Sequence, residues 1–257
     1  MKFNKLALAA IGAASLVVAG PAAADAYPDF TVNPSAYSAA ASFTADKITG
    51  NYAEVITFDG LGNFFVSIKF EAGQFVSNDG VDPVKGTGLT NDYGLYGLFM
   101  GQGVVGMGAT GPTFNLSSGL LNVYADDLNN TTFTAPANGG AAWGAVNGGD
   151  DVLLAVGPAV TGLGVTQPCQ GNLCGSFTQT TGFGLTAAGA SFFTAPVPFY
   201  NLSIQTGQLN QTIPTGAGTL SINGSLDVVF QRVPEPASLA LVGLALAGVG
   251  LARRKKA

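Results

Sequence analysis

The sequence predicts an all-β fold: a single antiparallel β-sandwich or jelly-roll-like domain, flanked by an apolar segment at each end of the chain. Apolar and polar residues alternate with a period of two, most clearly between residues 53 and 71. Turn-forming residues are frequent, and glycine supplies 37 of the 257 residues, about twice its usual share. Helical periodicity is nearly absent between the two ends. Many short strands separated by turns favour this architecture over a helical or mixed one.

Residues 1–26 are predicted to be a secretory signal peptide. Two lysines precede an apolar run at residues 6–19, and small residues follow it. Cleavage is expected after Ala24 or Ala26, and the pattern does not separate the two. An uncleaved anchor is the alternative, but the run is short for a membrane span.

The first strands of the domain, at residues 53–58 and 64–71, should form a hairpin around the turn at 60–63. A second hairpin is expected at Asn223-Gly224, because this dipeptide is a strong turn signal. The glycine-rich stretch 101–111 fits close-packed strands, bulges or loops. Further strands are predicted at residues 120–124, 152–156, 175–180, 189–194, 200–205, 219–222 and 225–230.

Residues 27–232 read as one β-rich extracellular domain with no internal linker. This span has four basic and thirteen acidic residues, a formal net charge of −9. Residues 86–231 contain no lysine or arginine at all. Such a surface repels phosphate backbones, so no nucleic-acid partner is expected.

No catalytic residue is predicted. The chain has no histidine, which excludes histidine-based triads, general bases and metal ligands. The predicted domain has two glutamates, Glu54 and Glu71, and Glu71 shares a strand face with Lys69. A solvated ion pair explains Glu71 better than a hydrolytic carboxylate pair. The protein is therefore expected not to be an enzyme.

Cys169 and Cys174 are the two cysteines of the chain. In an exported protein a close pair of this kind is expected to form a disulfide, which would close a small loop. A zinc site is disfavoured, because zinc needs about four ligands and the chain offers no histidine.

Two acidic pairs lie in glycine- and asparagine-rich stretches: Asp126-Asp127 and Asp150-Asp151. Carboxylate oxygens on such loops suit Ca²⁺. However, turns favour aspartate without any ligand, and the EF-hand spacing is absent. These four residues are weak calcium candidates, and no cofactor is otherwise expected.

Trp143 lies between loop signals, in the stretch 138–144. Two interpretations stay open for it. A buried anchor in the core is favoured, and an exposed ring that stacks on a sugar is the alternative.

Residues 233–257 form a tail of three parts. Pro234-Glu235-Pro236 is followed by the apolar run 237–252, and a basic end follows. As a helix the run spans about 24 Å, which is short for a hydrocarbon core of about 30 Å. The basic residues would stay on the cytoplasmic side of the membrane. They are Arg253, Arg254, Lys255 and Lys256.

This tail resembles the PEP-CTERM sorting signal. The resemblance implies a Gram-negative envelope or extracellular protein, transiently anchored in the inner membrane and processed by an exosortase. A permanent C-terminal anchor is the alternative.

The body also resembles the flocculation-associated PEP-CTERM proteins, over most of its length. The matching stretches are 29–32, 43–58, 93–99, 149–151 and 192–200. The resemblance implies a role in the exopolysaccharide matrix that holds bacterial flocs together. A secreted carbohydrate-binding β module is the alternative function, and a secreted hydrolase fits less well.

Overall fold

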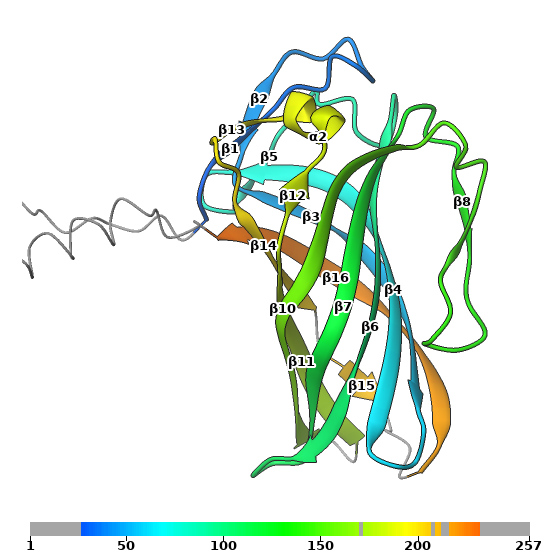
Figure 1. The fold of residues 1–257 in the computed structure, drawn as a ribbon. Helices are drawn as coiled ribbons and strands as arrows, with labels where there is room; N and C mark the ends of the chain where they lie inside the picture. The colour runs from blue at the N-terminus through cyan, green and yellow to red at the C-terminus, as the bar shows by residue number, and fades with distance from the viewer. Residues whose placement is uncertain (1–26, 170–171, 207–208, 212–215, 232–257) are drawn as a thin grey trace, which may run out of the picture.

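The computed structural model describes residues 27–169, 172–206, 209–211 and 216–231, and most of them belong to antiparallel strands (Figure 1). The predicted all-β fold is confirmed. The first seven strands are β1 Phe30–Val32, β2 Phe43–Ala45, β3 Lys47–Phe58, β4 Asn63–Ser77, β5 Asp82–Pro83, β6 Gly94–Met107 and β7 Pro112–Asp126. The next are β8 Thr132–Thr134, β9 Gly144–Val146, β10 Val152–Cys169, β11 Asn172–Thr181 and β12 Gly184–Leu185. The chain continues with helix α2 Ala187–Phe192, β13 Phe193–Ala195, β14 Asn201–Thr206, β15 Leu209–Gln211 and β16 Gly218–Gln231.

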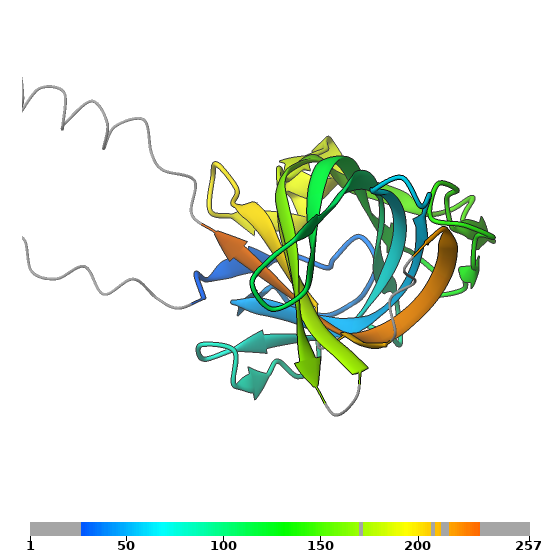
Figure 2. The same cartoon turned by 90° about the horizontal axis from the view of Figure 1, so that it is seen from below.

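The long strands form one large sheet that closes on itself. Its strands are hydrogen-bonded in the order β10-β7-β6-β4-β3-β16-β14-β11. The last strand, β11, also pairs with the first, β10, which closes the sheet. Figure 2 looks along the resulting ring. Opposite halves of the ring pack their inner faces across a shared core, as the layers of a sandwich do. The predicted sandwich-like arrangement is therefore confirmed, and the β10–β11 pairing joins its two layers.

The β3–β4 hairpin sets the inner and outer faces of the ring. The two strands pair in register from Phe58 opposite Phe64 to Ala53 opposite Lys69, as predicted. Because side chains alternate along a strand, Ile56 and Phe58 point inward while Thr57 points outward.

One end of the ring is filled by aromatic side chains. The short strands β1, β2 and β13 and helix α2 lie together at this end (Figure 1). Phe30 of β1 contacts Phe75, Phe193 and Phe230, with ring centroids 4.7–6.4 Å apart. Edge-to-face pairs of this kind add to the stability gained from burial alone.

The strand predicted at residues 189–194 is wrong. Residues 187–192 form α2, and only 193–195 form a strand. Thr186 caps the helix by accepting a hydrogen bond from the Gly189 backbone N–H at 3.0 Å. A helix of six residues is too short to show a helical period in the sequence, so only its cap could have revealed it.

The hairpin predicted at Asn223-Gly224 is also wrong, because β16 runs through both residues without a turn. Gly224 lies opposite Tyr52 of β3. A Cβ atom at Gly224 would come within 2.7 Å of the Tyr52 ring, so this glycine makes room for the ring. The glycine-rich stretch 101–111 also belongs in part to a strand rather than a turn. Residues 101–107 continue β6 as a close-packed strand.

No helix within the described ranges is both long enough and apolar enough to cross a membrane.

Candidate functional site

The outer face of β3 and β4 carries a covering segment, residues 127–151, which includes β8 and β9. Figure 1 shows this segment beside β4. The Gly139 backbone N–H donates a hydrogen bond to Thr57 Oγ1 at 2.9 Å. The Trp143 Nε1–H donates to the carbonyl of Ser67 at 3.2 Å. These two bonds hold the segment against the sheet, so its aromatic side chains lie over outward-facing strand residues.

Lys69 lies close to two aromatic rings of this covering segment. Its Nζ atom is 4.6 Å from the ring centroid of Phe133 and 5.5 Å from that of Trp143. Lys69 also forms an ion pair with Glu71, as the sequence predicted. Cations above aromatic faces are attracted by the ring quadrupole. The Trp143 side chain is half-buried, so it lies neither in the core nor fully in solvent.

Two tyrosines extend this arrangement across the neighbouring strands. The Tyr96 and Tyr124 rings stack at 5.1 Å, and Tyr96 meets Phe133 edge-on at 4.9 Å. The Tyr96 hydroxyl donates to Asp151. Burial, followed by the bond to Asp151, raises the pKa of Tyr96 well above its usual range. We call the partly exposed members of this set the outer aromatic surface: Tyr124, Phe133 and Trp143, with Lys69 and Glu71. Tyr96 itself is buried.

The four predicted calcium candidates do not gather around one point. Asp126 is buried and accepts hydrogen bonds from the backbone N–H groups of Asn130 and Thr131, at 3.1 and 2.9 Å. Asp151 accepts from the Thr131 hydroxyl at 3.0 Å. These carboxylates therefore order the loop by themselves.

The other two candidates lie nearby. Asp150 accepts from Asn130 at 3.4 Å, and Asp127 lies close enough to Tyr37 for its charge to help raise the pKa of that hydroxyl, after burial. In the part of the chain that the structure describes, no three acidic or cysteine side chains are grouped to hold a metal ion. Calcium binding stays a prediction.

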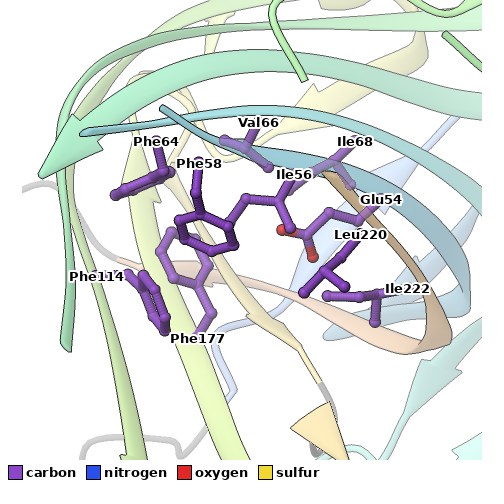
Figure 3. A pocket seen from close by; sticks show the side chains of 10 residues that line it. All are labelled: Glu54, Ile56, Phe58, Phe64, Val66, Ile68, Phe114, Phe177, Leu220 and Ile222. Carbon is purple, nitrogen blue, oxygen red and sulfur yellow. The ribbon is translucent and has the colours of Figure 1, made fainter. Parts of the chain in front are cut away.

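The inner face of the ring encloses an apolar chamber (Figure 3). Its volume is about 30 Å³, enough for about two water molecules, and it is partly open to solvent. The chamber is lined by Glu54, Ile56, Phe58, Phe64, Val66, Ile68, Phe114, Phe177, Leu220 and Ile222. Nine of these ten side chains are aliphatic or aromatic.

Glu54 is the one charged group in the lining, and its carboxyl points into the chamber (Figure 3). Burial among apolar side chains disfavours the ionised form and raises the pKa of Glu54 to about 7. Its carboxyl has neither a hydrogen-bond partner nor an ion pair among the described residues. The Glu54 residue as a whole is partly exposed, in line with the opening of the chamber to solvent.

A second polar side chain on the inner face also lacks a partner. Gln179 of β11 is 2% exposed, and neither its Nε2 nor its Oε1 atom makes a hydrogen bond within the described residues. Thr181 lies opposite Leu202, which lines a second apolar cavity of about 30 Å³. Directly opposite residues share a face, so Thr181 and Gln179 point inward.

The register of β10 and β11 places Cys169 opposite Asn172 and Cys174 opposite Gln167. The two cysteines are thus diagonal neighbours, at positions where Cα atoms are roughly 7–8 Å apart. Disulfides usually join Cα atoms about 4.4–6.8 Å apart. The side chains of both cysteines lie outside the described residues, so the disulfide stays a prediction.

Comparison with known proteins bears on the tail. Residues 232–256 match the model of the PEP-CTERM protein-sorting motif. The chain carries a PEP-CTERM sorting tail. The match includes Pro234, Glu235, Pro236 and the four terminal basic residues that the sequence analysis assigned to sorting. No curated protein and no solved structure matches the chain.

A PEP-CTERM tail marks a protein that is exported, transiently anchored in a membrane and processed by an exosortase at its C-terminus. The protein then reaches the cell surface or the extracellular space. The tail and the predicted signal peptide, residues 1–26, both lie outside the described residues. The signal peptide stays a prediction.

The inner chamber of this PEP-CTERM protein is not evident from the sequence. The first hairpin contains an indication of the chamber, because Glu54 lies on the same strand face as Ile56 and Phe58. A glutamate on an otherwise apolar strand face indicates either a partner or a buried acid. The closure of the sheet, which turns that face into a chamber wall, depends on the β10–β11 pairing and is not visible in any one segment.

Proposed function

We propose that this PEP-CTERM protein is a non-enzymatic component of the exopolysaccharide matrix of a Gram-negative bacterium, where it promotes flocculation and biofilm formation. The sorting tail supports the location. The resemblance of the body to flocculation-associated proteins supports the role.

The observation that carries the proposal is the outer aromatic surface. The Trp143 ring is half-buried, and its edge is fixed by the bond from Nε1 to Ser67. A ring that is held in place and partly open to solvent offers a flat apolar face to a neutral sugar. Lys69 and Glu71 beside it supply polar atoms for the sugar hydroxyls.

Charge argues against simple attraction to acidic polysaccharide, since residues 27–232 carry a formal net charge of −9. Bridging by Ca²⁺ fits less well than stacking. Asp126 and Asp151 already accept hydrogen bonds within their own loop. We therefore propose neutral-sugar stacking as the mode of contact.

The proposal that the protein is not an enzyme is supported by the placement of the two glutamates. Glu54 points into the chamber and Glu71 lies on the outer face, so the two carboxyls cannot flank one glycosidic bond. No histidine is available as a general base.

A Cys169–Cys174 disulfide is part of the proposal, because exported proteins meet an oxidising environment. Closing it draws the Cα atoms of the two cysteines closer together than in a regular diagonal pair. Thiol labelling of the unreduced extracellular protein should find no free thiol. Two labelled cysteines would contradict the disulfide and leave the matrix role untouched.

The test of the role is a deletion strain that still makes its polysaccharide. It should lose floc formation, and the wild-type gene should restore it. A Trp143→Ala gene should restore it poorly, while Leu61→Ala, an exposed apolar residue in the turn between β3 and β4, should restore it fully. Normal flocculation by the deletion strain would refute the matrix role. Loss of glycan binding in Trp143→Ala with normal flocculation would favour a carbohydrate-binding module instead.

A further inference from the structure

The inner chamber has features that a purely structural core does not need. A core of this size is stabilised by apolar burial, and an acid in its wall opposes that stability. Glu54 points into the chamber with no partner among the described residues, although Lys47 and Lys69 lie on the same hairpin. Lys47 forms an ion pair with Asp227, and Lys69 forms one with Glu71. Both pairs lie on the outer face of the ring.

Water is a poor partner for this acid. The chamber has room for about two water molecules, but a buried water normally makes two to four hydrogen bonds. The nine other lining side chains offer no polar atom. Water in the chamber is therefore weakly held, and an apolar molecule would displace it readily.

We propose that the inner chamber is a binding site for a small apolar molecule that carries one amine. The amine would donate its hydrogen bonds to the Glu54 carboxylate, and the alkyl or aryl body would contact the aliphatic and aromatic wall. Apolar pockets with a few polar groups that fix orientation are the usual form of small-molecule sites, and closed sheets of eight strands often provide them.

An amine fits better than a carboxylic acid or a simple alcohol. A second carboxylate beside Glu54 would add a like charge in an apolar site. An alcohol would make one neutral hydrogen bond, whereas an ammonium group makes a charge-assisted one. The Gln179 carboxamide, which has no partner among the described residues, gives the inner face a second polar group, for a ligand that reaches farther along the ring.

Proton release gives the site a distinctive signature. Glu54 has a pKa of about 7, so it is mostly neutral at pH 6 and must ionise to pair with an ammonium group. No other residue of the lining titrates, and the other titratable side chain on the inner face of β3 is Tyr52. Lys47, Lys69, Glu71 and Asp227 make their pairs on the outer side.

The test uses the processed protein collected from the culture medium and titrated calorimetrically with n-alkylamines and n-alkanols of one to four carbons, because the chamber is small. Affinity for the amines should rise about fourfold for each added CH₂ until the chamber is full. At equal length the amine should bind about tenfold more tightly than the alcohol. At pH 6, amine binding should release close to one proton, measured by comparing buffers of different ionisation enthalpy.

Glu54→Gln should abolish proton release and the preference for amines. This variant keeps the shape of the side chain, and an unchanged circular dichroism spectrum would show that it folds. Glu71→Gln is the matched control on the outer face, and it should leave amine affinity and proton release unchanged. The proposal is overturned if the wild-type protein binds no alkylamine, if amines and alcohols bind equally, or if Glu54→Gln keeps the wild-type affinity for amines.

Discussion

Glu54 and Glu71 belong to one hairpin, yet their surroundings have little in common. Glu71 lies outside the ring, about half exposed, in an ion pair with Lys69 beneath the Phe133 and Trp143 rings. Glu54 lies inside, among nine apolar side chains, with no partner in the described part of the chain. The two residues belong to adjacent, paired strands, on opposite faces.

Side chains alternate between the two faces of a strand. This contrast shows that the face to which a carboxyl group points decides its surroundings, and therefore its pKa, in this fold. On the outer face an acid meets solvent, a lysine and a covering loop, so it stays an ordinary surface group. On the inner face the same group loses its hydration, which raises its pKa. Four predictions test this contrast, from the largest expected effect to the smallest.

The largest effect is a pH dependence of stability that comes from Glu54. Its pKa rises from 4.5 in the unfolded chain to about 7 in the folded protein, so between these values the folded state holds more protons. The free energy of unfolding should therefore fall as pH rises, by about 3 kcal/mol between pH 4.5 and 8. Denaturant unfolding of wild type and Glu54→Gln at both values measures the difference. An identical pH dependence in the two proteins would show that Glu54 is solvated.

The next effect concerns packing on the inner face. Gly224→Ala places a methyl group within 2.7 Å of the Tyr52 ring and should lower the free energy of unfolding by about 2 kcal/mol. Gly149→Ala is the matched control in the covering segment, where an added methyl group meets nothing within 4 Å. It should change stability by less than about 0.5 kcal/mol. Equal losses in both variants, measured by thermal unfolding, would contradict the difference between the faces.

The sequence predicted much of this fold because its strongest signals are local. Alternation located the β3–β4 hairpin, and the pairing of Lys69 with Glu71 followed from their shared face. The signals that failed were also local. Asn223-Gly224 looks like a turn, but Gly224 is required by Tyr52, which lies 172 positions earlier in the sequence. Closure through β10 and β11, and hence the chamber around Glu54, is a long-range property that no short window contains.

The third prediction concerns Trp143 on the outer aromatic surface. Trp143→Ala removes the hydrogen bond to Ser67 and the contact with Lys69, and it should lower the free energy of unfolding by about 1–2 kcal/mol. Trp143→Phe keeps a ring without the N–H and should lose about half as much. Denaturant curves measure both variants. A loss above about 3 kcal/mol in Trp143→Ala would place the ring in the core rather than on the surface.

The smallest effect is expected from the outer ion pair. Glu71→Gln should lower stability by less than about 1 kcal/mol, because pairs with an exposed partner gain little in water. The loss should shrink further in 1 M salt, where charges are screened within about 3 Å. Thermal unfolding at low and high salt measures it. A larger loss that salt does not change would mean that the outer pair is as desolvated as Glu54.

The most direct test of the contrast between the faces is the pKa of Glu54, followed through the side-chain carboxyl ¹³C resonance as pH is varied. The glutamate resonance that disappears in Glu54→Gln identifies the signal. Burial in the apolar chamber predicts a midpoint near pH 7. A midpoint near 4.5, the value of a solvated glutamate, would contradict a Glu54 carboxyl that is desolvated in the apolar chamber and lacks a partner among the described residues.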